Sequence, residues 1–256
     1  MIEIRPIVSD EARPFLELLC EVFELDASRA EGIFFGEPFF DLDRKWALFE
    51  AGVPISILTT VPLQFGWGRA FGIAGVATRP DRRGKGYAGQ LLDAVFARSE
   101  REGEGAALLF ARLPELYERA GFRTVDEVVR LPVPLGTEAV DPDVLTFEEV
   151  EARYSAWAER DPARLRRDAR RWRYWRWTLR MCTALADGYL CLEGNTLREA
   201  VFENPPDVWP FSGGVEWFGL RSMAEGLGIE GEGKHELFLM ARNVPVRPQM
   251  FLTDQF

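Results

Sequence analysis

The segment from Arg83 to Ala88, with the sequence RGKGYA, has residue types that suit the binding of an anion such as a phosphate group. Its two glycines have no Cβ, so a ligand can approach the backbone closely. The segment lies between an apolar run that ends at Thr78 and an amphipathic stretch that begins at Tyr87, which predicts a strand-to-helix junction. At the start of such a helix the unpaired N–H groups and the helix dipole attract anions. The alternative is an ordinary glycine turn with solvated basic side chains.

Several other chemistries fit the sequence poorly. The segment has neither the Gly-Lys-Ser/Thr ending of a P-loop nor the three glycines of a dinucleotide-binding turn. The chain has one histidine, His235, which disfavours a Ser-His-Asp triad and most zinc sites based on histidine. Its three cysteines have no metal-type spacing. We therefore expect no metal.

The elements that would position the segment follow from hydrophobic periodicity. We expect an N-terminal strand over 2–7 and a helix that buries Phe15, Leu18 and Leu19. Further strands are expected over 46–52, 53–65, 69–78 and 106–111. The helix after Tyr87 would bury Leu91, Leu92, Val95 and Phe96.

Two segments, one after the other in the chain, resemble motifs A and B of the GNAT superfamily of acyl-CoA-dependent N-acyltransferases. Arg83, Gly86 and Ala88 match the motif A pattern of that family, Gln/Arg-x-x-Gly-x-Gly/Ala. Downstream, LYERAGF at residues 116–122 resembles motif B, Tyr-x-x-x-Gly-Phe/Tyr. The segment GVATRPDRRGKGYAGQLL is most similar to the Eis-like group (enhanced intracellular survival proteins). This resemblance covers residues 1–130 well.

The resemblance implies an α/β (α+β) fold of the GNAT type, with a mixed, mostly antiparallel central sheet flanked by helices. It also implies tandem domains: a catalytic GNAT domain over 1–134 and a second, degenerate GNAT-like domain over 135–256. The proline-rich stretch 131–143 would link them, and Arg164 to Trp172 carries the looser resemblance of the second domain. Many Eis-like chains have a third, sterol-carrier-like domain, which we do not expect to fit within 256 residues.

The same resemblance assigns roles to residues. Backbone groups near Val76 would pair with the pantetheine arm of acetyl-CoA, and the turn before the helix would hold its pyrophosphate. The residues expected to bind acetyl-CoA are Val76, Ala77, Thr78, Arg82, Arg83, Gly84, Lys85, Gly86, Tyr87 and Ala88. Tyr117 would donate a proton to the departing thiolate. In the Eis-like group a C-terminal carboxylate, often on phenylalanine, can act as the base, which makes Phe256 a catalytic candidate.

A base is needed because an alkyl amine is mostly protonated at neutral pH. The expected strands around 71–78 and 106–111 carry no acidic side chain. The remaining candidates are the carboxylates of Glu24, Asp26, Glu37, Asp41 and the terminal residue Phe256. Loss of the proton to water is the other alternative.

Charge limits the expected partners. The formal net charge is −10, which disfavours nucleic acid and anionic membranes and favours a cationic ligand. Residues 160–180 carry nine arginines and suggest nucleic-acid contacts as one interpretation. The favoured interpretation is an apolar stripe of Leu165, Trp172, Trp175 and Leu179 with the arginines in water. No apolar run approaches the ~20 residues of a membrane span, and no secretory signal is evident, so we expect a cytoplasmic protein.

These observations predict an N-acetyltransferase that moves an acetyl group from acetyl-CoA to a primary amine. The expected acceptors are a cationic small molecule, such as a polyamine or an aminoglycoside, or a lysine side chain. The alternative is a catalytically inactive regulatory protein that binds acyl-CoA. The sequence leaves open whether the protein is a homo-oligomer.

Overall fold

The computed structural model describes residues 2–136, 143–177 and 181–256. The strands in the first half are β1 (Ile2–Pro6), β2 (Lys45–Glu50), β3 (Val53–Phe65), β4 (Gly68–Thr78), β5 (Ala106–Ala111) and β6 (Arg123–Pro132). Those in the second half are β7 (Leu165–Arg166), β8 (Met181–Leu185), β9 (Gly188–Glu193), β10 (Thr196–Val201), β11 (Glu216–Leu220) and β12 (Lys234–Arg242). The α-helices are α1 (Ala12–Phe23), α2 (Ala27–Gly36), α3 (Tyr87–Arg101), α4 (Glu115–Glu118), α5 (Phe147–Glu159), α6 (Ala169–Trp177) and α7 (Arg221–Gly226).

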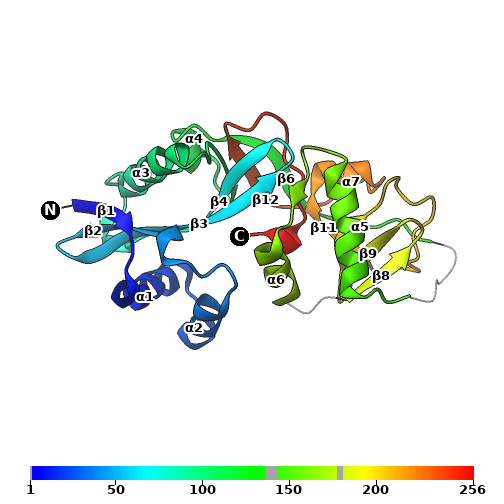
Figure 1. The fold of residues 1–256 in the computed structure, drawn as a ribbon, viewed down its shortest axis with the longest axis horizontal. Helices are drawn as coiled ribbons and strands as arrows, with labels where there is room; N and C mark the ends of the chain where they lie inside the picture. The colour runs from blue at the N-terminus through cyan, green and yellow to red at the C-terminus, as the bar shows by residue number, and fades with distance from the viewer. Residues whose placement is uncertain (1, 137–142, 178–180) are drawn as a thin grey trace.

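One continuous sheet runs through both halves of the chain (Figure 1). Its strand order is β1-β2-β3-β4-β5-β12-β6-β11-β10-β9-β8, and β7 pairs with β3 off this path. Within the described residues, only the β4–β5 and β10–β11 pairs are parallel. The mixed, mostly antiparallel sheet flanked by helices is therefore confirmed.

Helices cover both faces of the first half of the sheet, with α3 on one side and α1 and α2 on the other (Figure 1). The predicted stripe of α3 is buried, and Leu91 and Val95 are completely inaccessible. On the opposite face, Phe15 and Leu18 of α1 are likewise buried. Burying each such side chain contributes roughly 1.5–3 kcal/mol, so these stripes fix both helices against the sheet.

Strand β12 joins the two halves. It lies between β5 and β6, where Phe238 pairs with Ala111 and Leu239 pairs with Asp126. A strand from the C-terminal part of the chain therefore completes the sheet begun by the first 134 residues. The division into domains at 134/135 stays a prediction.

The described part of the segment 160–180 is not one continuous helix. Leu165 and Arg166 form the short strand β7 on β3, and the described helix α6 begins only at Ala169. Asp168 accepts a hydrogen bond from the backbone N–H of Arg171, in the first turn of α6. Residue Leu179 of the predicted stripe, and residues 137–142 of the predicted linker, lie outside the described residues.

Candidate functional site

Strand β4 contains a β-bulge at the place where it separates from β5. Ile57 pairs with Ala77 and Thr59 pairs with Ala74, so β4 has one extra residue between these pairs. Gly75 lies within this interval with a φ of 59°, a left-handed conformation that suits glycine. Such a bulge bends the strand and changes the direction of its backbone groups.

The edge of β4 that faces β5 is paired only at its start. The pairs run from Ala70↔Ala106 to Ile73↔Leu109. Beyond Ile73, no strand in the described parts of the chain pairs with this edge. The predicted residues Val76, Ala77 and Thr78 lie on this stretch, where an extended ligand could form the hydrogen bonds of an absent strand.

The turn after β4 has a backbone conformation that favours glycine at two positions. Gly84 and Gly86 have φ values of 77° and 76°, which explains the need for glycine at both positions. Gly86 is the N-cap of α3, and no side chain caps this helix. The first N–H groups of α3, which begin at Tyr87 and Ala88, are thus oriented as an anion-binding helix terminus.

Two arginines brace this turn. Arg82 lies 3.3 Å from the carboxylate of Glu50, and Nε of Arg83 donates to the carbonyl oxygen of Thr78 at 3.4 Å. Lys85 is exposed at the tip of the turn. The three cations lie in the turn that precedes the helix, where positive charge would favour the binding of a phosphate group.

Tyr117 lies on α4 and is half-buried against the same hydrophobic core that Val76 and Tyr87 border. Its ring packs edge-on against Phe122 with a centroid separation of 6.2 Å. Burial raises the pKa of the Tyr117 hydroxyl, so this group stays protonated at neutral pH. It can therefore donate a proton in this part of the molecule.

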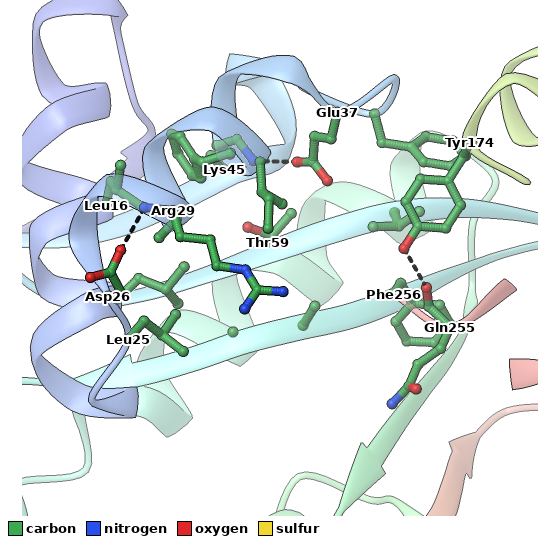
Figure 2. A pocket seen from close by; sticks show the side chains of 18 of the residues that line it. Leu16, Leu25, Asp26, Arg29, Glu37, Lys45, Thr59, Tyr174, Gln255 and Phe256 are labelled. Atoms are coloured by element: carbon green, nitrogen blue, oxygen red, sulfur yellow. Dashed lines mark hydrogen bonds and ion pairs between the residues drawn. The ribbon is translucent and has the colours of Figure 1, made fainter. Parts of the chain in front are cut away.

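A cavity of about 530 Å³ lies on the other face of the sheet (Figure 2). Side chains from α1, α2, β2, β3, β4 and α6 line it together with the last two residues of the chain. It reaches Ala74 and Gly75, directly beside the bulge. A molecule bound in the cavity would therefore contact the strand that carries the predicted acetyl-CoA site.

Three of the predicted carboxylates line this cavity: Glu24, Asp26 and Glu37. Asp26 caps α2 by accepting the backbone N–H of Arg29 at 2.7 Å. Asp41 does not reach the cavity lining and instead lies 3.6 Å from Arg170. The structure thus brings together three of the four acidic side chains that the sequence could only name as remote candidates.

Lys45 is a cavity residue that the sequence did not single out. Its ammonium donates to Oε1 of Glu37 at 3.1 Å and lies 4.3 Å from the centre of the Phe34 ring. Only 1% of the residue is exposed, and this burial lowers the pKa of its ammonium group. The only sequence signal was a lysine at the start of an apolar strand.

The second half of the chain supplies the wall opposite α2. The hydroxyl of Tyr174 donates to the backbone oxygen of Gln255 at 3.1 Å (Figure 2). The ring of Phe256 lies next to Gly72 and 5.6 Å from the ring of Phe110. Phe256 therefore lines the cavity, close to the point where β4 and β5 separate, and its catalytic role stays a prediction.

A buried ionic cluster holds this wall in place. The guanidinium of Arg167 donates to the carboxylates of Asp254 and Glu199, and all three side chains are fully buried. Arg171 donates to the backbone oxygens of Asp254 and Pro62 at 3.0 and 2.9 Å. The expectation that the arginines of this segment lie in water is wrong for Arg167 and Arg171, because buried acceptors from distant segments compensate their charge.

Other features lie away from the cavity. His235 is 3.8 Å from Glu127 on the surface of the second half. Within residues 2–136, 143–177 and 181–256, no group of three or more His, Cys, Asp or Glu side chains could hold a metal ion. The helices in these ranges are too short or too polar to cross a bilayer.

The first half of the chain matches a known protein family. Residues 3–125 match the family model described as "Acetyltransferase (GNAT) domain". No curated protein gives a significant match.

Solved structures are similar over nearly the whole chain. A GCN5-related N-acetyltransferase from Kribbella flavida is 17% identical, with a TM-score of 0.73 over 94% of this chain and 70% of that one. One from Anabaena variabilis is 16% identical, with a TM-score of 0.71 over 94% and 72%. Eis1 from Mycobacterium abscessus is 14% identical, with a TM-score of 0.64 over 93% and 73%. At these identities the likeness shows a shared fold.

Proposed function

We propose, from the premise that residues 3–125 form a GNAT acetyltransferase domain, that this protein transfers an acetyl group from acetyl-CoA to a primary amine. The observation that carries the proposal is the stretch from the bulge of β4 to the start of α3. It combines an unpaired strand edge with an uncapped helix terminus, one suited to an extended amide-bearing arm and the other to a pyrophosphate. Together they match the two polar parts of coenzyme A.

In this proposal acetyl-CoA lies along Val76, Ala77 and Thr78. Its pyrophosphate binds the backbone of residues 83–88, with Arg82, Arg83 and Lys85 nearby. A backbone N–H near Val76 would stabilise the negative charge that develops on the thioester oxygen. Tyr117 would protonate the departing thiolate, since its raised pKa keeps the proton on the hydroxyl at neutral pH.

The amine would enter from the cavity that borders Gly75. Holding it against the bulge converts the attack into a step between two positioned groups, which supplies much of the rate. The base remains one of Glu24, Asp26, Glu37 or the Phe256 carboxylate, or solvent water. Their place on the cavity wall supports these candidates over Asp41.

The cavity wall from α6 and residues 255–256 supports a role for the second half in binding the acceptor. We propose that residues 1–134 and 135–256 are tandem GNAT-like domains and that the protein is of the Eis-like kind. Its fold likeness to Eis1 supports this assignment.

The experiment is release of free CoA thiol from acetyl-CoA across a panel of primary amines. A Gly86→Glu variant should abolish the release, because a side chain and a negative charge would occupy the pyrophosphate position. Gly103→Glu is the matched control, since Gly103 has a φ of 78°, has equally open surroundings and lies beyond the other end of α3. Amine-dependent release in the parent and the control, but not in Gly86→Glu, is the expected result.

Calorimetry with acetyl-CoA separates the remaining outcomes. If acetyl-CoA binds but no amine causes release of CoA, the protein would be the acyl-CoA-binding regulator and not an acetyltransferase. Absence of both binding and release would refute the proposed cofactor site.

A further inference from the structure

We propose that the acceptor is a primary amine attached to an apolar body, such as an alkylamine or an arylalkylamine, rather than a polycation. This inference rests on the proposed acetyl transfer and concerns what fills the 530 Å³ cavity. Three independent features of the cavity carry it: its apolar walls, the balance of its charges and the exposed apolar side chains at its rim.

The walls of the cavity are mostly hydrocarbon. The large apolar side chains that line it include Leu16, Leu19, Ile33, Phe34, Phe39 and Val61. Leu16, Phe34, Phe39 and Val61 are buried in the folded chain, so the wall they form is held in place by the core. An apolar ligand surface in contact with this wall is removed from water, whereas the hydroxyl groups of a sugar or the ammonium groups of a polyamine would lose their hydration there.

The negative charge of the chain is not concentrated in the cavity. The described lining residues include three acids and three bases: Glu24, Asp26, Glu37, Arg29, Lys45 and Arg171. The formal charges of these six side chains cancel, and the Phe256 carboxylate, one of the proposed bases, adds a single negative charge, whereas the whole chain carries −10. The net charge of the protein therefore gives no local preference for a ligand with several ammonium groups.

Two of these acids already have partners. Glu37 accepts from the buried ammonium of Lys45, and Asp26 accepts the backbone N–H of Arg29. The guanidinium of Arg29 points into the cavity (Figure 2), where it would repel an additional cation. One ammonium group can be accommodated near a carboxylate, but further ones would compete with Lys45 and Arg29 for the carboxylates of the cavity.

The rim of the cavity exposes apolar side chains. Leu25 and Ile33 line the cavity and are 45% and 48% exposed. Phe23 at the end of α1 and Phe35 near the end of α2 are also exposed. Large apolar side chains gathered at a cavity are typical of sites that bind an apolar ligand. The apolar body of the amine would cover Leu25 and Ile33 while its amino group approaches Gly75.

The test compares kcat/KM, with acetyl-CoA saturating, for butylamine, hexylamine, octylamine, phenethylamine, spermidine and kanamycin. Each added methylene that enters the cavity should raise kcat/KM about fourfold, the equivalent of about 0.8 kcal/mol per buried methylene. Hexylamine and phenethylamine should exceed spermidine and kanamycin by tenfold or more.

A pair of variants tests the location. Ile33→Asp places a carboxylate at the rim and should lower kcat/KM for hexylamine about tenfold while raising it for spermidine. Val53→Asp is the control, because Val53 is also 48% exposed but begins β3 outside the cavity lining. It should leave both amines unchanged.

The outcomes distinguish this inference from the proposed function. Spermidine or kanamycin equal to or better than the alkylamines, or no dependence on chain length, would overturn the apolar acceptor while acetyl transfer to amines stands. No CoA release with any amine of the panel would overturn both. The chain-length series in the parent protein does not depend on how well the variants fold.

Discussion

The ring of Phe256 lies so close to Gly72 of β4 that a Cβ at this glycine would be 2.5 Å from the ring. Gly72 pairs with Leu108 just before the last β4–β5 pair, so the ring marks the place where the two strands separate. A residue at the end of the described chain thus packs on the centre of the first half's sheet. The contact gives a physical reason for glycine at position 72, because only glycine leaves room for the ring.

Replacing Gly72 with alanine should displace the ring and distort one wall of the cavity. Overpacking of this kind costs about 1–3 kcal/mol, and we expect kcat/KM for the amine to fall as well. Thermal unfolding and steady-state kinetics measure the two effects. Gly105→Ala is the control, because nothing lies within 4 Å of its added Cβ.

The double variant Gly72→Ala/Phe256→Ala tests the cause. In a protein that already carries Phe256→Ala, adding Gly72→Ala should cost little further stability, because the ring that would clash with the new Cβ is absent. Additive losses would show that the ring is not the source of the constraint.

Replacing Tyr117 with phenylalanine should lower kcat by ~10²–10⁴ while leaving the affinity for acetyl-CoA unchanged. The ring would still pack against Phe122, so the change removes the hydroxyl and little else. Steady-state kinetics and calorimetry with acetyl-CoA check the two halves of this expectation. An unchanged kcat would exclude Tyr117 as the acid.

Replacing Arg167 with methionine should destabilise the protein by about 3–5 kcal/mol. The change would leave the buried carboxylates of Glu199 and Asp254 without the guanidinium that compensates them. Urea unfolding measures the loss. Arg160→Met is the control, because Arg160 pairs with Glu203 at the surface and its loss should be close to neutral.

Stability should depend on acid pH through Glu199. Burial alone would raise the pKa of this carboxyl, but the charge of Arg167 and hydrogen bonds from Thr253 and Trp175 outweigh it, and the net pKa is lowered. A lowered pKa in the folded state contributes stability above the unfolded pKa of about 4.3, and this contribution is lost as the pH falls through the folded value. The free energy of unfolding should therefore decline below pH ~4.3.

The variant Glu199→Gln isolates this contribution. Its unfolding free energy should decline less steeply in acid than that of the parent, because one titrating group has been removed. Urea unfolding between pH 7 and pH 3.5 gives both curves. Parallel curves would show that Glu199 has the same pKa in the folded and unfolded states.

Some elements escaped prediction from the sequence although their signals were present. Helix α5 begins with a capping box in which Thr146 and Glu149 satisfy each other's backbone N–H groups, a pattern readable from the sequence. Strand β6 carries charged residues such as Asp126 and Arg130 that obscure its alternation. In the folded protein Arg130 pairs with Glu216 of β11 and with Glu236 of β12, both far away in the chain.

The sequence by itself determined the features that depend on near neighbours. The positive φ angles of Gly84 and Gly86, and the buried stripe of α3 with Leu91 and Val95, follow from residue type and spacing within one turn and one helix. Backbone sterics and hydrophobic periodicity act over a few residues, so they can be read locally.

Only the tertiary structure decided which distant groups meet. Arg167 and Asp254 are 87 residues apart, and only the folded chain brings them together as a buried ion pair. The contact of Phe256 with Gly72 likewise joins the last residue described to a strand in the first half of the chain. Burial reverses the expectation for a charged residue whenever an opposite charge is buried beside it, and the sequence does not state which partner that is.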